Sequence, residues 1–200
     1  MVLGITGGFG CGKSTVARLL GERGFRCLDS DVLVREKVLP SAAVHAALRA
    51  RYGETVFSQD GSVNRSALGE RAFSDDTERA WLEDLTHPMV FALWRSAIRD
   101  AAPGAGPGNG GVRWALEVPL LFEKGLENWF DYIVCVACSP EQQFARLEQR
   151  GWNRALAGQR ISKQLPLARK MELSDFVLWN EGSPEFLKAQ VDRLVNSVAA

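Results

Sequence analysis

The glycine-rich stretch GITGGFGCGKST, residues 4–15, constrains the fold of this chain more than any other feature. Residues 7–14 match the pattern G-x-x-x-x-G-K-[ST] at every fixed position. A short apolar run, VLGIT, ends inside the stretch, and an amphipathic run, KSTVARLLGERG, leaves it. Glycines let a backbone approach phosphate oxygens closely, and the N-terminus of a helix favours negative charge. The sequence therefore predicts a phosphate-binding loop between a buried strand and a helix.

The polar groups of this loop have separate expected tasks. The Lys13 ammonium is expected to reach the β- and γ-phosphates of a nucleotide, and the Ser14 hydroxyl to ligate Mg²⁺. Thr15 is placed to contact the α-phosphate. Backbone N–H groups are expected to bind phosphate at four further positions: Gly8, Gly10, Cys11 and Gly12. These tasks define a nucleotide site and leave open which reaction it serves.

The rest of the chain alternates short apolar runs with amphipathic runs. After VLGIT, strands are expected within FRCLDSD, VRWALEVPLLFE, YIVCVAC and SDFVLWNEG. Helices are expected after Ser41, after Ser139 and after Ser183, and Gln142 is expected to complete a capping box with Ser139. A long helical region starting at NRSAL is expected to break near Ser74 and at Pro88. This alternation predicts a three-layer α/β fold, a mostly parallel sheet with helices on both faces.

Composition narrows the class of protein. Lys and Arg together number 24, as do Asp and Glu, so the chain lacks the excess positive charge on which nucleic-acid and membrane-surface binders depend. There is no apolar run long enough to span a bilayer and no charged leader before the loop. The four cysteines indicate neither a disulfide framework nor zinc spacing, and Cys135 and Cys138 should point to opposite faces of a strand. We expect a cytoplasmic protein.

The segment PGAGPGNGG, residues 103–111, is the one stretch of low complexity. Glycine and proline at this density hold neither helix nor strand. It lacks the strand-turn-helix setting of a phosphate loop. We expect a flexible surface connection.

Reaction classes that share a phosphate loop differ in their other motifs. A small GTPase needs an N-K-x-D motif, which is missing here, and a motor or AAA-type ATPase is normally longer. A small kinase needs a carboxylate beside the acceptor and arginines that neutralise the phosphoryl group. Asp29 and Asp31, in LDSD, follow the second expected strand, where a carboxylate lies beside the phosphate loop. One of them is expected to act on the attacking hydroxyl; the other interpretation is a helix cap.

The second kinase feature is a series of arginines in ARLEQRGWNRALAGQR: Arg146, Arg150, Arg154 and Arg160. Arg146 and Arg150 are four residues apart and so share a helix face. The series suits a lid that closes over a triphosphate. A solvated surface helix explains the same charges, and both interpretations stay open.

Several motifs in this order resemble the dephospho-CoA kinase family over nearly the whole chain. They are TGGFGCGKST, DSD, NRSALGERAF, THPMV, EVPLLFE, SPEQQFARLEQR, RISKQ and SDFVLWNEG. The resemblance implies transfer of the γ-phosphoryl of ATP to the 3′-hydroxyl of dephospho-CoA, with Mg²⁺. It also implies one P-loop kinase domain: a core of approximately 1–40, 112–138 and 175–200, a helical CoA-binding excursion at 41–102 and a lid at 139–170. A monomer or weak homo-oligomer is expected.

The resemblance also implies roles for single residues. Asp31 matches the catalytic carboxylate, and Lys13 and Ser14 match the phosphate and Mg²⁺ ligands. Arg146 matches an arginine that contacts phosphates. Arg65 and His87 match positions in the region that receives the CoA moiety, although a structural His-Pro turn accounts for His87 equally well.

Two residues depart from the family pattern. Cys11 stands where Ser or Thr is usual, and a thiol at a helix N-terminus is expected to have a lowered pKa and to be oxidisable. Glu117 replaces an aspartate; its longer side chain can still orient a Mg²⁺-bound water. Two alternative functions remain at this level: a nucleoside or nucleotide kinase relative, and a non-catalytic ATP-binding sensor.

Overall fold

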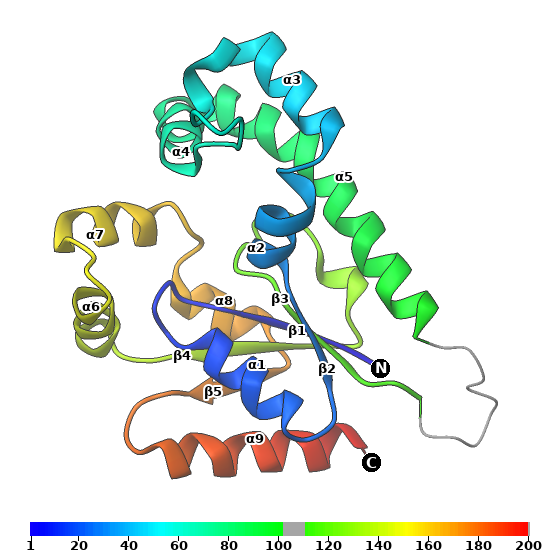
Figure 1. Ribbon diagram of the computed structural model, residues 1–200. Coiled ribbons are helices and arrows are strands. Elements are labelled where there is room, and N and C mark those ends of the chain that lie inside the picture. The colour runs from blue at the N-terminus through cyan, green and yellow to red at the C-terminus, as the bar shows by residue number, and fades with distance from the viewer. Residues whose placement is uncertain (102–110, 200) are drawn as a thin grey trace. The chain divides into compact units, whose positions relative to one another are not determined.

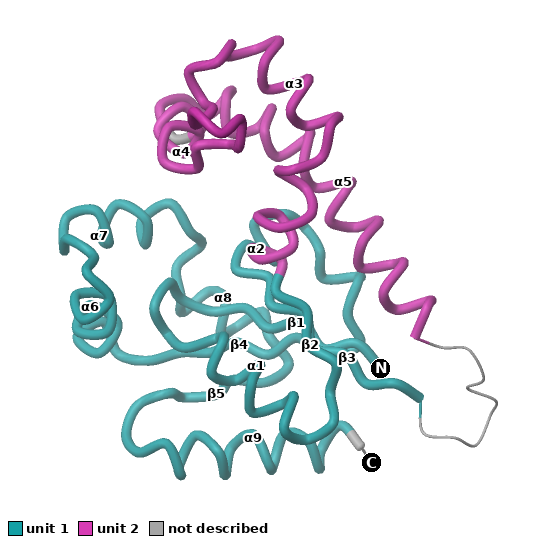
Figure 2. The backbone as a smooth tube through the Cα atoms, viewed as in Figure 1, with its two compact units in different colours: residues 1–29, 104–200 teal, residues 30–103 magenta. Residues whose placement is uncertain are grey.

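The computed structural model describes residues 1–101 and 111–199. The chain divides into two compact units, one of residues 1–29 and 104–200 and one of residues 30–103 (Figure 2). Apart from Gly111, the glycine- and proline-rich segment 103–111 lies outside the described residues. The roles expected for the core, the CoA-binding excursion and the lid stay predictions.

The first unit is built on five parallel strands in the order β2-β3-β1-β4-β5 (Figure 1). The strands are β1 (Val2–Gly7), β2 (Arg26–Asp29), β3 (Trp114–Glu117), β4 (Tyr132–Ala137) and β5 (Phe176–Trp179). Because all five run in the same direction, their carboxyl ends meet at one edge of the sheet. The phosphate loop and the segments after the other strands therefore lie along that edge.

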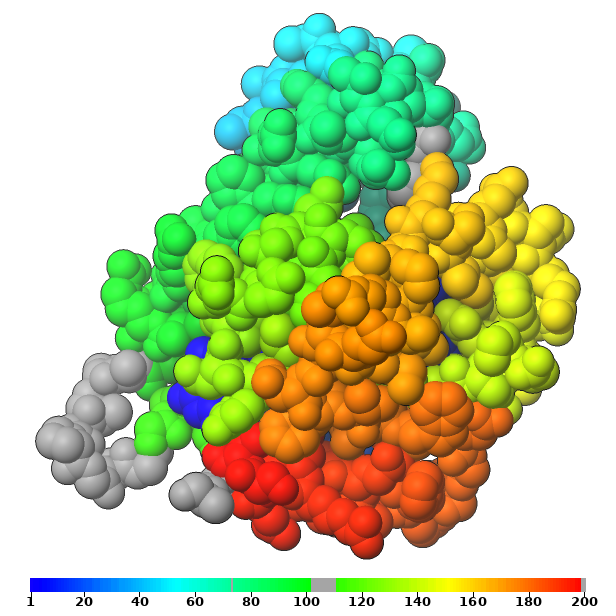
Figure 3. All heavy atoms as spheres, turned by 180° about the vertical axis from the view of Figure 1, so that it is seen from behind, coloured from blue at the N-terminus to red at the C-terminus, as the bar shows by residue number. Residues whose placement is uncertain are grey.

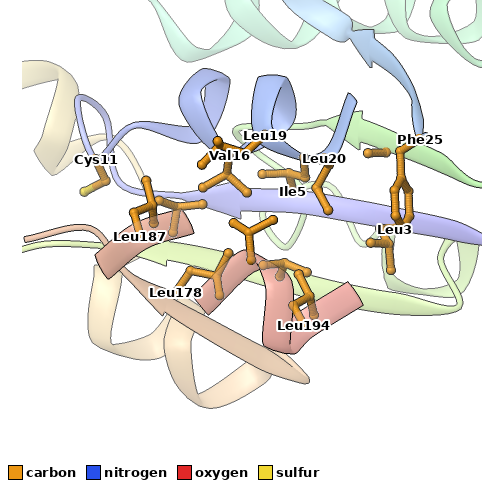
Figure 4. Packing of buried hydrophobic residues seen from close by; sticks show 14 of the residues in the cluster. Leu3, Ile5, Cys11, Val16, Leu19, Leu20, Phe25, Leu178, Leu187 and Leu194 are labelled. Atoms are coloured by element: carbon orange, nitrogen blue, oxygen red, sulfur yellow. The ribbon is translucent and has the colours of Figure 1, made fainter. Parts of the chain in front are cut away.

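One face of the sheet packs on helices α1 (Lys13–Gly21) and α9 (Pro184–Ala199). Leu19 and Leu20 of α1 meet Leu187 and Leu194 of α9 in a single buried cluster with the strands (Figure 4). Alternate strand residues enter this cluster, including Leu3, Ile5, Val134 and Val136. Cys138 belongs to the cluster as well.

The other face packs on α8 (Leu167–Leu173) and on the segment that follows β3. Figure 3 shows this segment beside α8 on the surface seen from behind. Gly4 of β1 has no room for a side chain here, because a Cβ would lie 2.8 Å from Leu121 and from Phe130. Helices on both faces confirm the expected three-layer fold. The unit also contains the 3₁₀ turn η3 (Glu127–Trp129), α6 (Pro140–Gln149) and α7 (Arg154–Ser162).

The second unit is helical. Its elements are α2 (Ser30–Leu33), the π-helical turn η1 (Val34–Val38), α3 (Ala42–Tyr52), the 3₁₀ turn η2 (Gly53–Val56), α4 (Arg65–Ser74) and α5 (Asp76–Asp100). Side chains cap two of its helices: Ser41, after which a helix was expected, accepts from the Val44 N–H, and Asn64 accepts from the N–H groups of Ser66 and Ala67.

Two local expectations were wrong. Helix α5 continues through Pro88, although proline removes one backbone hydrogen bond there, because Thr86, Val90 and Trp94 are buried on both sides of it. His87 therefore does not form a His-Pro turn. Ser139 caps α6 as expected, but its backbone N–H donates to Glu181 (3.0 Å) in place of Gln142.

All four cysteines are free thiols, and Cys135, unlike Cys138, lies outside the cluster under α1. The two thiols are therefore separated as expected, although Cys138 lies one residue beyond the end of β4. Within residues 1–101 and 111–199, no helix has the length and apolar character needed to cross a membrane.

Substituting alanine for Gly7 tests the steric basis of the loop. Gly7 has φ +137°, and a Cβ would lie 2.1 Å from the carbonyl oxygen of Val136. We expect Gly7→Ala to lower the free energy of unfolding by about 2–5 kcal/mol, from backbone strain and overpacking together. Urea denaturation midpoints at unchanged m values measure this.

Gly158→Ala is the matched control, because Gly158 lies inside α7 and its Cβ would meet no described atom within 4 Å beyond its own helix and chain neighbours. Alanine there should raise stability by about 0.5–1 kcal/mol, since glycine is a poor helix former. Equal effects of the two substitutions would contradict the steric argument.

Candidate active site

The loop between β1 and α1 has a conformation that only glycine allows. Gly7, Gly10 and Gly12 have φ angles of +137°, +86° and +98°. A Cβ on Gly10 would lie 2.8 Å from Leu147, and one on Gly12 would lie 2.2 Å from Asn180. The pattern of glycines recognised in the sequence is therefore a steric requirement of the turn as well as a feature of phosphate binding.

Lys13 begins α1 and folds back over the loop. Its Nζ donates to the carbonyl oxygens of Gly8 (3.0 Å) and Gly7 (3.3 Å), and the residue is only 7% exposed. No side chain caps α1 at Gly12. The first turn therefore presents backbone N–H groups and an ammonium together, which is the arrangement that attracts a phosphate chain.

The far side of the loop is held by Arg146 of α6 and by Asn180, which follows β5. Asn180 Nδ2 donates to the carbonyl oxygen of Cys11 (2.8 Å). Arg146 donates to the same oxygen (3.4 Å) and to Asn180 Oδ1 (3.4 Å). The expected arginine thus lies at the loop, and Asn180 is a site residue that sequence reasoning missed. Its signal was its place directly after a parallel strand.

Gln143 and Glu181 are two further missed residues. Gln143 Nε2 donates to the carbonyl oxygen of Phe9 (2.5 Å) in the loop. The Ser139 backbone N–H (3.0 Å) and hydroxyl (2.8 Å) both donate to Glu181 and hold the pKa of this carboxyl below its usual range. These bonds join the ends of β4 and β5 and fix the start of α6, which carries Arg146.

The remaining arginines of the series have different surroundings. Arg154 pairs with Glu148 (3.1 Å), whereas Arg150 is exposed just beyond the end of α6. The Arg160 guanidinium lies over the rings of Trp152 (4.9 Å) and Phe9 (5.8 Å). Phe9 and Trp152 contact each other edge to face, with centroids 5.1 Å apart. Arg160 is therefore stacked on the phosphate loop itself, while Arg150 does not share the half-buried position of Arg146.

A buried ion pair anchors α8 beneath the sheet. Lys170 is fully buried and donates to Glu123 Oε1 (2.9 Å) and to the carbonyl oxygen of Pro119 (2.7 Å). Glu123 Oε1 also accepts from the backbone N–H of Leu165 (2.8 Å). The PLLFE segment after β3 and the chain entering α8 are thereby joined through one carboxylate.

The other candidate residues lie at strand ends or in the second unit. Asp29 ends β2 and stands in register with Glu117 at the end of β3. Asp31, in α2, is exposed; Arg65, the first residue of α4, is exposed too. His87 lies half-buried in α5, its ring centroid 6.0 Å from that of Phe91.

Metal binding is the last chemical test of the site. Among the described residues, no group of three or more His, Cys, Asp or Glu side chains is placed to hold an ion. Mg²⁺ usually takes one or two protein ligands and completes its shell with phosphate oxygens and water. The exposed Ser14 in the first turn of α1 therefore fits an ion that enters with a nucleotide.

Comparison with known proteins gives one consistent result. The family model for dephospho-CoA kinase matches residues 1–185. A dephospho-CoA kinase of Thermosynechococcus vestitus is 45% identical over 193 residues, covering 96% of this chain and 91% of the relative. One of Gloeobacter violaceus is 40% identical over 199 residues, with coverages of 99% and 93%.

Solved structures of similar proteins share this fold. TT1252 from Thermus thermophilus superposes with a TM-score of 0.81 at 32% identity, covering 99% of this chain and 97% of that one. The dephospho-CoA kinase from Campylobacter jejuni reaches 0.68 at 23% identity, with coverages of 98% and 96%, and supports the fold.

Breaking the buried ion pair should cost more than breaking an exposed one on the same helix. Lys170→Met leaves the mostly buried Glu123 carboxylate uncompensated, so we expect a loss of about 3–5 kcal/mol in the free energy of unfolding. Arg169→Met is the control, because the Arg169–Glu172 pair of α8 is more than half exposed and should contribute little. Urea denaturation measures both.

The double variant Lys170→Met/Glu123→Gln isolates the interaction. Neutralising Glu123 removes the uncompensated charge, so the double variant should be more stable than Lys170→Met alone. Strict additivity of the two single substitutions would contradict a direct ion pair.

Proposed function

The chain belongs to the dephospho-CoA kinase family, and we propose that it transfers the γ-phosphoryl of ATP to the ribose 3′-hydroxyl of dephospho-CoA, giving CoA and ADP. The observation that carries this proposal is the glycine loop with Lys13 folded over its carbonyl oxygens and Arg146 at its far side. Phosphoryl transfer needs positioning and charge neutralisation more than covalent chemistry. Both are available from this loop and its neighbours.

On the donor side, the backbone of Gly8, Gly10, Cys11 and Gly12 is proposed to bind the phosphate chain. The Lys13 ammonium moves from the carbonyl oxygens of Gly7 and Gly8 to the β- and γ-phosphates, where its hydrogen bonds are charge-assisted at both ends. Thr15 contacts the α-phosphate. Ser14 ligates Mg²⁺, which when bound neutralises charge on the β- and γ-phosphates.

Arg146 is proposed to contact the transferring phosphoryl group. Its bonds to the Cys11 carbonyl and to Asn180 are both long, at 3.4 Å, so a phosphate offers stronger, charge-assisted partners. The position of Arg146 is set by α6, whose start is fixed by Ser139 and Glu181. A small movement of its guanidinium is then enough to change partners.

On the acceptor side, Asp31 is proposed as the general base for the 3′-hydroxyl. It follows Asp29 by two residues, and two residues of chain span at most about 7 Å, so connectivity holds it near the carboxyl end of β2. That edge of the sheet also carries the phosphate loop. Arg65 and His87, from the helical unit, are proposed to bind the CoA moiety.

We also propose that the enzyme works in the cytoplasm as a monomer or weak homo-oligomer. Its four free thiols suit a reducing compartment. Light scattering on the purified chain measures the assembly state directly.

Replacing the Asp31 carboxylate tests the base. Asp31→Asn should lower kcat by about 10²- to 10⁴-fold because the amide cannot take the proton of the attacking hydroxyl. ATP affinity, measured by calorimetry, should change little. Asp29→Asn is the matched variant: if it lowers kcat and Asp31→Asn does not, the base is Asp29.

The acceptor is tested by coupled ADP release with dephospho-CoA, adenosine, AMP or water alone. We expect ADP only with dephospho-CoA, and removal of Mg²⁺ by EDTA should abolish it. Release with adenosine or AMP would favour a nucleoside or nucleotide kinase. Binding of ATP without release in any mixture would favour a nucleotide sensor.

A further inference from the structure

Two buried cysteines meet behind the phosphate loop. The Cys138 thiol donates to the sulfur of Cys11, with the two Sγ atoms 3.3 Å apart. Their residues are 2% and 0% exposed. The contact follows from strand pairing: Gly7 of β1 is in register with Val136 of β4, so the segments that leave these strands begin side by side. Figure 4 labels Cys11 at one end of the buried cluster, on the loop that enters α1.

We propose that Cys11 and Cys138 form a reversible disulfide on reaction with a hydroperoxide, and that this bond switches off nucleotide binding at the phosphate loop. The site is a covalent modification site and lies outside the transfer reaction itself. It also assigns a chemical task to two thiols that phosphate binding leaves unused.

The steps balance with hydrogen peroxide as the oxidant. The Cys11 thiolate attacks one peroxide oxygen, the O–O bond breaks, and the released hydroxide takes up a proton to form water. Cys11 is then a sulfenic acid. The Cys138 sulfur attacks the Cys11 sulfur, the S–O bond breaks, and the Cys138 proton leaves with the hydroxyl group as a second water. Both sulfurs are oxidised to the disulfide, and a dithiol reverses the change by thiol-disulfide exchange.

The surroundings assign the first step to Cys11. The hydrogen bond from Cys138 lowers the pKa of Cys11 to about 7, with help from the nearby Lys13 charge and against the effect of burial. The same hydrogen bond, together with burial, raises the pKa of Cys138. The pair therefore contains one thiolate-forming sulfur, which can become the sulfenic acid, and one protonated partner, which can then resolve it to the disulfide. The burial of both sulfurs restricts the reagent to one of small size.

The other two cysteines serve as internal controls. Burial raises the pKa of Cys135 to about 12, and this residue lies outside the cluster that holds Cys11 and Cys138. Cys27 of β2 is exposed as a residue. Its sulfur atom is nevertheless partly covered, and this burial raises the pKa of the Cys27 thiol. Neither has a thiol partner among its described hydrogen bonds; Cys27 donates to the carbonyl of Ala17 (3.1 Å).

The bond would distort the loop. A disulfide holds its sulfurs about 2.05 Å apart, so these two must approach by roughly 1.2 Å. The backbone of Cys11 is bonded on both sides: its carbonyl oxygen accepts from Asn180 (2.8 Å), and its N–H donates to the Gly8 carbonyl oxygen (3.2 Å). A shift of Cys11 toward Cys138 would therefore disturb the neighbouring backbone groups of the loop. A misplacement of about 1 Å at a reacting site costs on the order of 10²-fold in rate.

The test uses the full chain, treated with hydrogen peroxide, alkylated and digested. We expect a cross-linked peptide pair joining Cys11 to Cys138, a fall of at least about tenfold in kcat/KM for ATP, and recovery of both with dithiothreitol. Binding of a fluorescent ATP analogue should fall in parallel. This binding and the mass measurement do not depend on the acceptor, so they can fail or succeed independently of the proposed kinase activity.

Cysteine variants distinguish oxidation of the Cys11–Cys138 pair from general oxidation of the protein. Cys138→Ala should keep its basal activity, lose the cross-link and be labelled at Cys11 by dimedone. Cys135→Ala should keep both the cross-link and the reversible inactivation. Cys138→Ser, which keeps a small polar side chain, replaces Cys138→Ala if the alanine variant fails to fold. Absence of the cross-link at a peroxide dose that oxidises Cys27 overturns the site, and a cross-linked enzyme with undiminished ATP binding overturns the switch.

Discussion

The structure depends on one steric constraint, the close approach of the loop after β1 to its neighbours. Gly7 lies against the backbone of Val136, Gly10 against Leu147 and Gly12 against Asn180. Each neighbour comes from a different part of the chain, at β4, in α6 and after β5. Because no side chain fits between them, the loop backbone itself forms the surface that we propose binds the nucleotide. Lys13 and Arg146 then add positive charge to a shape that the glycines have already fixed.

This packing explains why residues far from the loop in sequence belong to the site. The parallel sheet brings the ends of β1, β4 and β5 to one edge, and the side chains there bond to carbonyl oxygens of the loop. Gln143 and Asn180 do not need to touch a substrate to matter. By holding the carbonyl oxygens of Phe9 and Cys11, they fix the conformation of the loop backbone. Preorganisation of the site is thus a property of three strand ends together.

The sequence was sufficient to predict the fold class and the glycine loop, because both follow from patterns of neighbouring residues. The continuous apolar run YIVCVAC predicted β4, and Ser41 and Ser139 marked the starts of their helices. The expected helix break at Pro88 was wrong. Burial of Thr86, Val90 and Trp94 on both sides of the proline outweighs its local tendency to interrupt a helix. Asn180, Gln143 and Lys170 were missed because their partners lie 34 to 169 residues away, and no spacing rule encodes such pairs. The roles of Asp31, Arg65 and His87 stay predictions, since they depend on a substrate and not on contacts within the chain.

Cys11 shows how a phosphate loop can carry a second property. In the proposed function Cys11 acts through its backbone, whose N–H donates to the Gly8 carbonyl oxygen (3.2 Å) in this structure, so its side chain needs only to fit the core behind the loop. Serine, threonine and cysteine are similar in size, so exchange among them leaves the backbone surface unchanged. What the exchange alters is chemistry, because only the thiol can form a covalent bond with a second sulfur at the end of the neighbouring strand. Since β1 and β4 are paired in register, any cysteine at the equivalent place after β4 is held within reach of it. The same strand pairing that positions the loop therefore also makes its conformation, in the proposed switch, sensitive to the oxidation state of these two sulfur atoms.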